Sequence, residues 1–115
     1  MTVVIIDEDH AFREALAIAA RLEGHQVLTA GSAPEAEALL AGAGLLVVDC
    51  LVGGADELLA RRAGRGPALV AGHRRDLAER MAERHGLRAL EKPFGVEELG
   101  LGAPVSFSPV GRGPG

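Results

Sequence analysis

The sequence predicts a single α/β domain built around a doubly wound parallel β-sheet. Three short segments, residues 3–6, 45–48 and 68–71, are continuously apolar, which is typical of strands buried on both faces of a sheet. Segments with helical spacing of apolar residues lie between them, and this alternation indicates successive βα units. The length of 115 residues fits one domain of ordinary size.

The first βα unit is expected to combine a strand at residues 3–6 with a helix at residues 11–23, which Gly24 ends. Its apolar face is predicted from helical spacing to contain Phe12, Leu16, Ala19 and Leu22. The residues available for the solvent side are Arg13, Glu14 and Arg21.

The second unit begins with residues 26–30, where apolar and polar residues alternate, so this strand is expected nearer an edge of the sheet. Ser32 and Glu35 have the spacing of a capping box, which predicts the start of a second helix reaching about residue 41.

The remaining elements repeat the alternation. The expected strands are residues 45–48, 68–71 and, more weakly, 87–90. A short third helix is expected at residues 56–62. Asp76 and Glu79 form a second cap pattern before a highly charged fourth helix that ends near His85. Only residues 96–99 look helical after the last strand, so the last helix is expected to be shortened.

The domain is expected to occupy residues 1–100, and residues 101–115 form a tail rich in Gly and Pro that is expected to be disordered. The net charge is −4, with acidic and basic residues interleaved, which argues against nucleic acid as a partner. Cys50 is the single cysteine, which excludes an internal disulfide. Without a signal peptide or a long apolar run, a cytoplasmic protein with no membrane association is expected.

Carboxylates follow two of the predicted strands. The first strand ends in Asp7 and Glu8, and the third ends in Asp49. Sites in open α/β sheets lie beyond the carboxyl ends of strands, so these three carboxylates converge if the two strands are neighbours. Their mutual repulsion would be relieved by a hard divalent cation with oxygen ligands, for which Mg²⁺ is the candidate. Lys92 follows the fifth strand and can bring an ammonium to the same edge.

This set of side chains suits phosphoryl transfer. Asp49 stands alone at the end of an apolar strand and is the candidate nucleophile, because a carboxylate can form an acyl phosphate. Asp7, Glu8 and Asp49 are the candidate metal ligands, and Lys92 would offset charge on the phosphoryl oxygens. The alternative is that these acidic residues only cap the next helix, as Asp9 is placed to do.

Four motifs resemble the receiver domain of bacterial response regulators over residues 2 to about 100. They are VVIIDED at residues 3–9 with Arg13 after it, EGHQV at 23–27, LLVVD at 45–49 and EKPF at 91–94. The resemblance implies a flavodoxin-like fold with strand order 2-1-3-4-5. It also implies a phosphoryl group taken from a histidine kinase or phosphotransfer protein, and a cis peptide at Lys92–Pro93.

The sequence also departs from the family at positions that usually transmit the signal. Ala71 stands where the family has Ser or Thr, with His73 as a possible substitute, and Ala89 replaces the switch aromatic residue. After Asp49, Gly53 and Glu57 stand where the family favours proline and glycine. These departures define an atypical receiver in which coupling between the phosphate and the partner face is weak or absent.

Three functions compete. The first is a phosphate-accepting receiver without an output domain, an enzyme at most in its own phosphorylation and dephosphorylation, with an unknown downstream protein target. The second is a pseudo-receiver that binds proteins independently of phosphorylation. The third is a flavin or nucleotide binder, which the absence of G-x-G-x-x-G and P-loop patterns disfavours. A monomer or weak dimer is expected, because the usual dimer face is altered.

Overall fold

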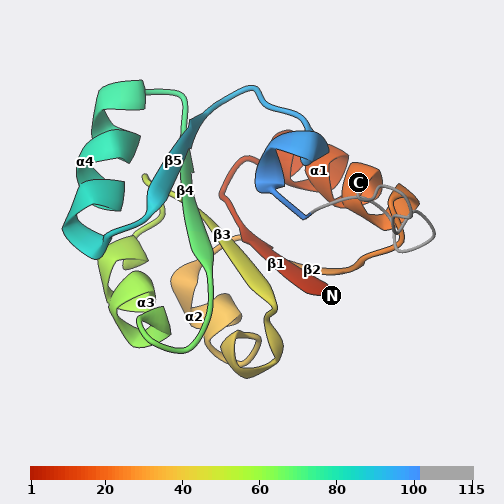
Figure 1. Ribbon diagram of the computed structural model, residues 1–115, viewed down its shortest axis with the longest axis horizontal. Helices are drawn as coiled ribbons and strands as arrows, with labels where there is room; N and C mark the ends of the chain where they lie inside the picture. The colour runs from red at the N-terminus through yellow and green to blue at the C-terminus, as the bar shows by residue number, and fades with distance from the viewer. Residues whose placement is uncertain (102–115) are drawn as a thin grey trace, which may run out of the picture.

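A parallel β-sheet forms the centre of the molecule, and helices cover both of its faces (Figure 1). The computed structural model describes residues 1–101, so all but the first residue of the predicted tail lies outside the described residues. The five strands are β1 (Thr2–Ile6), β2 (Gln26–Ala30), β3 (Leu45–Asp49), β4 (Ala68–Gly72) and β5 (Arg88–Glu91). Their order, β2-β1-β3-β4-β5, confirms the predicted flavodoxin-like topology.

The helices divide between the two faces of the sheet. α1 (His10–Leu22) and the terminal 3-10 turn η2 (Val96–Leu99) cover one face (Figure 1). α2 (Ala33–Glu37), α3 (Ala55–Arg62) and α4 (Arg75–His85) cover the other, with a 3-10 turn η1 (Leu40–Gly42) after α2. The predicted shortening of the last helix is confirmed within residues 1–101, where the 3-10 turn η2 is the only helical element after β5.

Two aliphatic cores lie on opposite faces of the sheet because successive strand residues point to opposite sides. In β3, Leu45 and Val47 pack toward α1, whereas Leu46 and Val48 pack toward α3 and α4. Every residue of β3 and β4 is buried, as expected for the inner strands of a doubly wound sheet.

The predicted apolar face of α1 is wrong at its C-terminal end. The residues that α1 buries are Leu16, Ala17 and Ala20, while Leu22 is 83% exposed. Ala17 and Ala20 have small side chains, so α1 can lie close to the sheet with this side inward. Leu22 then points away from the core.

Two helix boundaries also differ from the prediction. α2 ends at Glu37, because the leucines after it, Leu39 and Leu40, turn inward against the core instead of continuing the helix. The hydroxyl of Ser32 accepts from the Glu35 amide, as a capping box requires, but the Glu35 carboxylate accepts from the Gly31 amide. In α4 the N-cap is Arg74 and not Asp76, which lies in the first turn.

Within residues 1–101, none of the helices has the length and apolar character needed to cross a membrane. The Lys92–Pro93 peptide bond is cis, as the resemblance implies.

Candidate functional site

The candidate site lies at the carboxyl edge of the sheet, where three of the predicted residues meet. Asp7 directly follows β1, Asp49 is the last residue of β3, and Lys92 directly follows β5. β1 and β3 are hydrogen-bonded neighbours, with Ile6 in register with Val48, so the two aspartates leave the sheet side by side. The two strands are neighbours, so the carboxylates of Asp7 and Asp49 converge as the sequence analysis expects.

Lys92 bridges the two aspartates. Its Nζ lies 2.6 Å from Asp7 Oδ2 and 3.0 Å from Asp49 Oδ1. All three residues are buried, with exposed fractions of 3% for Asp7, 6% for Asp49 and 5% for Lys92. Lys92 is also the only lysine of the sequence. Removing one member of such a buried ion triplet would leave an uncompensated charge away from water, which is strongly destabilising.

Backbone amides orient both carboxylates. Asp7 Oδ1 accepts a hydrogen bond from the Asp9 amide at 2.9 Å, and Asp49 Oδ2 accepts one from the Leu51 amide at 3.0 Å. Each aspartate therefore presents one oxygen to the backbone that follows its strand and the other to Lys92. The loop direction after each strand thus fixes the carboxylate plane.

The ammonium of Lys92 is stabilised in its charged form. Burial lowers the pKa of Lys92, but the hydrogen bonds and charges of Asp7 and Asp49 outweigh this effect, so the pKa lies above its usual 10.5. The Phe12 ring adds a further contact, with its centroid 4.6 Å from Nζ. Phe94 packs edge-on against Phe12 at a centroid distance of 5.2 Å.

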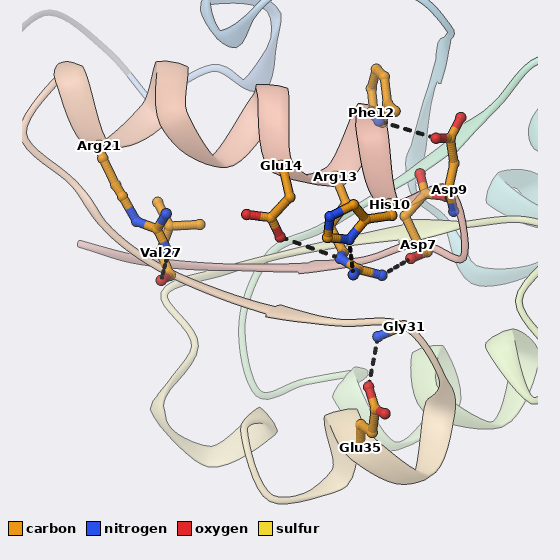
Figure 2. A network of polar contacts seen from close by, with 10 residues as sticks. All are labelled: Asp7, Asp9, His10, Phe12, Arg13, Glu14, Arg21, Val27, Gly31 and Glu35. Atoms are coloured by element: carbon orange, nitrogen blue, oxygen red, sulfur yellow. Dashed lines mark hydrogen bonds and ion pairs between the residues drawn. The ribbon is translucent and has the colours of Figure 1, made fainter.

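The start of α1 holds the first aspartate in place (Figure 2). Arg13 Nη1 donates to the main-chain oxygen of Asp7 at 2.8 Å, and Arg13 also contacts His10 Nδ1 at 2.9 Å. Asp9 is the N-cap of α1, because its carboxylate accepts from the Phe12 amide at 3.1 Å, and this bond lowers the pKa of Asp9. Asp9 therefore caps α1, as expected, whereas the carboxylate of Asp7 does not cap the helix.

Glu8 is not brought to the same point. It is exposed, whereas Asp7 and Asp49 are buried. Over the described part of the chain, no group of three or more His, Cys, Asp or Glu side chains is gathered to hold a metal ion. Glu8 follows Asp7 directly in the sequence, but its side chain is exposed and is not part of the buried cluster.

The donor set nevertheless fits a hard divalent cation. Two carboxylates share one ammonium, which leaves one negative charge uncompensated. Each carboxylate oxygen accepts one hydrogen bond within residues 1–101, so each keeps a lone pair for a further partner. Anionic oxygens of this kind are what Mg²⁺ and Ca²⁺ prefer.

Of the positions that depart from the receiver pattern, Ala71 lies beside this cluster. Ala71 is the register partner of Asp49 on β4 and is 1% exposed, so a methyl group occupies the place next to the carboxylate. Ala89 lies on β5 and packs against the core on the α4 side. His73 is exposed. Cys50 is buried, and burial raises the pKa of its thiol, which agrees with an inert cysteine.

The part of the cluster that sequence reasoning missed is the aromatic contact to Lys92. Helical spacing predicts that Phe12 lies on the apolar face of α1, which accounts for its packing but not for the ammonium beneath its ring. Neither Phe12 nor Lys92 carries a local signal for this contact, because the two residues are far apart in the sequence and meet only in the folded chain.

Solved structures with this fold are response regulator receiver proteins. One from Burkholderia phymatum is 25% identical, with a TM-score of 0.74 over 90% of this chain and 98% of that one. A receiver domain from Methanospirillum hungatei, described as CheY-like, is 20% identical with a TM-score of 0.73, covering 85% and 86%. The chain therefore has the fold of a receiver domain, the class found in two-component signalling.

A third similar structure is of a protein that contains a phosphorylated aspartic acid. It is a response regulator from Burkholderia pseudomallei with a phosphorylated aspartic acid, a calcium ion and citrate. It is 23% identical, with a TM-score of 0.75, and the match covers 85% of this chain and 63% of that one. No protein-family model and no curated protein matches this chain.

Proposed function

We propose that this chain is a two-component receiver that takes a phosphoryl group on Asp49 from a histidine kinase or phosphotransfer protein, with Mg²⁺. The observation that carries the proposal is the buried cluster in which Lys92 bridges Asp7 and Asp49 at the carboxyl edge of the sheet. The receiver fold and the phosphorylated aspartic acid in the Burkholderia pseudomallei protein support it.

In the proposed reaction, a carboxylate oxygen of Asp49 attacks the phosphorus of a phosphohistidine on the donor. A P–O bond forms, the P–N bond breaks, and the electron pair of that bond stays on the imidazole nitrogen. Lys92 keeps its ammonium beside the developing charge, because its pKa is raised by the two aspartates. The Leu51 amide holds the second oxygen of Asp49, which orients the attacking one.

The cation would be held by Asp7 and Asp49, with Glu8 available at the exposed rim. When bound, it neutralises charge on the phosphoryl oxygens. The fully buried aspartates set the position of the site, while the exposed side chain of Glu8 can turn without disturbing the core.

The direct test is intact-protein mass spectrometry after incubation with acetyl phosphate and Mg²⁺. The wild type should gain one phosphate, and Asp49→Asn should gain none, because an amide cannot act as the nucleophile. Asp76→Asn is the matched control, since Asp76 is an exposed acid on α4 and its replacement should leave the adduct unchanged. A phosphate on Asp49→Asn would contradict the assignment.

A second candidate function is a pseudo-receiver, a protein-interaction domain that does not switch. Two residues favour it. Ala71, which lies beside Asp49, has no hydroxyl, and Ala89, which lies on β5, has no aromatic ring. This function would become the better proposal if the wild type gained no phosphate from acetyl phosphate and none from a phosphorylated donor protein. An Asp49→Ala protein that kept its partner would then support it.

A further inference from the structure

A second cavity lies away from Asp49, where α2 and α3 are side by side (Figure 1). Its volume is about 500 Å³, and the residues that line it are Glu37, Leu40, Ala41, Arg61, Arg62 and Arg65. We call this cavity the arginine pocket. The turn η1 and the loop after α3 lead into β3 and β4, so the pocket lies at the amino edge of the sheet. Three arginines and one glutamate give it a net charge of +2, in a chain whose net charge is −4.

Arg62 brings a buried charge to this pocket without a carboxylate to balance it. Within residues 1–101 four charged side chains are buried, and the other three are the Asp7, Asp49 and Lys92 cluster, whose members pair with one another. The guanidinium of Arg62 donates to backbone oxygens, which carry no net charge, and these bonds use four of its five N–H groups. Buried charges are normally paired with an opposite charge, so Arg62 lacks a counter-ion among the described residues.

Arg65 is the second group of the pocket whose charge is not balanced. Every other arginine within residues 1–101 donates a hydrogen bond or pairs with a carboxylate, and Arg65 alone does neither. A basic residue in the last turn of a helix complements the helix dipole, which accounts for Arg61 but not for Arg65, which lies beyond α3. The one carboxylate that lines the pocket, Glu37, pairs with Arg61.

We propose that the arginine pocket binds a small dianionic phosphate, either free phosphate or a phosphate monoester. The charges of Arg62 and Arg65 are left without a partner, and a phosphate group carries roughly 1.5 to 2 negative charges near pH 7. The planar guanidinium group matches phosphate oxygens and can donate two parallel hydrogen bonds to them. Leu40 and Ala41 line the rest of the pocket, which suits the organic part of a monoester.

Glu37 is expected to oppose this binding. Its ion pair with Arg61 is exposed, with side-chain exposures of 46% for Glu37 and 54% for Arg61, and exposed pairs of this kind contribute little stability. A phosphate can therefore compete with the Glu37 carboxylate for the guanidinium of Arg61. Removing the charge of Glu37 should strengthen phosphate binding while leaving the fold intact.

An NMR titration of the full chain, followed through its backbone amide signals, tests the site. The ligands are inorganic phosphate and adenosine monophosphate, with EDTA present so that no divalent cation recruits phosphate to Asp49. The amide signals of Gly64 and Gly66, which flank Arg65, should shift to saturation, and that of Gly53, in the loop after Asp49, should not. Acetate, a monoanion, should bind roughly tenfold more weakly, because it balances only one of the two charges.

Tighter binding of adenosine monophosphate than of inorganic phosphate would support the proposal with an organic monoester as the ligand. Equal binding of the two would support it with free phosphate as the ligand, because the rest of the pocket then contributes nothing.

Three variants separate binding at the pocket from a change in stability. Arg65→Met should weaken phosphate binding roughly tenfold, because it removes one charge-assisted contact without breaking a bond of the folded chain. Glu37→Gln should strengthen it roughly threefold, although it removes an ion pair from the folded chain. Arg80→Met is the matched control, since Arg80 is an exposed arginine on α4, and it should bind phosphate like the wild type.

The proposal is overturned by any of four results. These are Gly64 and Gly66 signals that do not move at tens of millimolar of either phosphate, acetate binding as tight as phosphate binding, an Arg65→Met protein that binds phosphate like the wild type, and an equal loss of binding in Arg65→Met and Arg80→Met. The last result would show that phosphate responds to the overall charge of the chain and not to this pocket.

Discussion

Lys92 is the residue on which the charge balance of the site depends. Its ammonium lies within 3.0 Å of both Asp7 and Asp49, away from water. Removing it would leave two carboxylates buried side by side, and breaking a buried ion pair in this way typically costs about 3–5 kcal/mol. The same contact that suits phosphoryl transfer therefore also contributes to the stability of the fold.

The raised pKa of Lys92 predicts a specific dependence of stability on pH. Because the folded-state pKa lies above the ordinary 10.5, the contribution of Lys92 is complete below about pH 10.5 and is lost as the pH rises through the folded-state pKa. The difference in free energy of unfolding between the wild type and Lys92→Met should therefore shrink as the pH rises through the folded-state pKa of Lys92. Urea unfolding at a series of alkaline pH values measures this difference.

The titration can also be followed directly, since the chain has a single lysine. One side-chain resonance of Lys92 in a lysine-labelled NMR sample should report a pKa above 10.5 in the wild type and a lower one in Asp49→Asn, which loses one of the two charges. A wild-type titration below 10.5 would show that burial, and not the aspartates, dominates at this position.

At the scale of secondary-structure elements, the side chain of Arg62 connects three segments that are separate in the sequence. These are α3, the turn η1 with the residue after it, and the loop before β4. Arg62 lies at the end of α3, is 5% exposed, and donates to Leu40 O, Ala43 O and Pro67 O at distances from 2.9 to 3.4 Å. Burial lowers the pKa of Arg62. Gly66 makes room for its side chain, since a Cβ there would lie 2.6 Å from Nη2.

This role predicts a large loss of stability for Arg62→Met. The methionine keeps most of the apolar stem but removes the guanidinium donor. The Ala43 oxygen then loses its side-chain donor, while the Leu40 and Pro67 oxygens each keep only a backbone amide. The free energy of unfolding should fall by roughly 1–3 kcal/mol. Arg65→Met, at an exposed position of the next loop, should change it by no more than about 0.5 kcal/mol. Urea denaturation measures the free energy of unfolding of both variants. An equal loss in the two would contradict the proposed role of Arg62 in connecting these segments.

The strands and helices also differ in how well local sequence patterns predict them. The predicted third strand, residues 45–48, differs from β3 by one residue, because a run buried on both faces is visible in composition alone. The orientation of α1 was not predictable in the same way. Leu16 belongs to the predicted apolar face and to the observed one, but Leu22 does not, because the packing of Ala17 and Ala20 against the sheet decides the rotation of the helix.

For the whole molecule, the sheet order has a consequence for cation binding. It assembles Asp7 and Asp49 from segments far apart in the sequence into one preformed donor pair. A cation that binds this folded arrangement, and not the unfolded chain, must stabilise the fold by mass action.

Millimolar Mg²⁺ should accordingly raise the midpoint of thermal unfolding. At a concentration about ten times the dissociation constant, the gain is about 1.4 kcal/mol, or on the order of 5 °C for a domain of this size. Asp7→Asn should lose most of this response, while Asp76→Asn should keep it. An equal shift in the wild type and Asp7→Asn would place the cation elsewhere.

The sequence by itself determined the class of the fold, the order of strands and helices along the chain, and the three residues, Asp7, Asp49 and Lys92, that end or follow a strand. Those features follow from local periodicity and from the residues that end each strand, which any parallel sheet brings to the same side. Only the tertiary structure decided that Lys92 bridges both aspartates beneath Phe12, that Glu8 faces the solvent, and that α1 turns Leu22 outward. These depend on strand register and helix rotation, which distant packing sets.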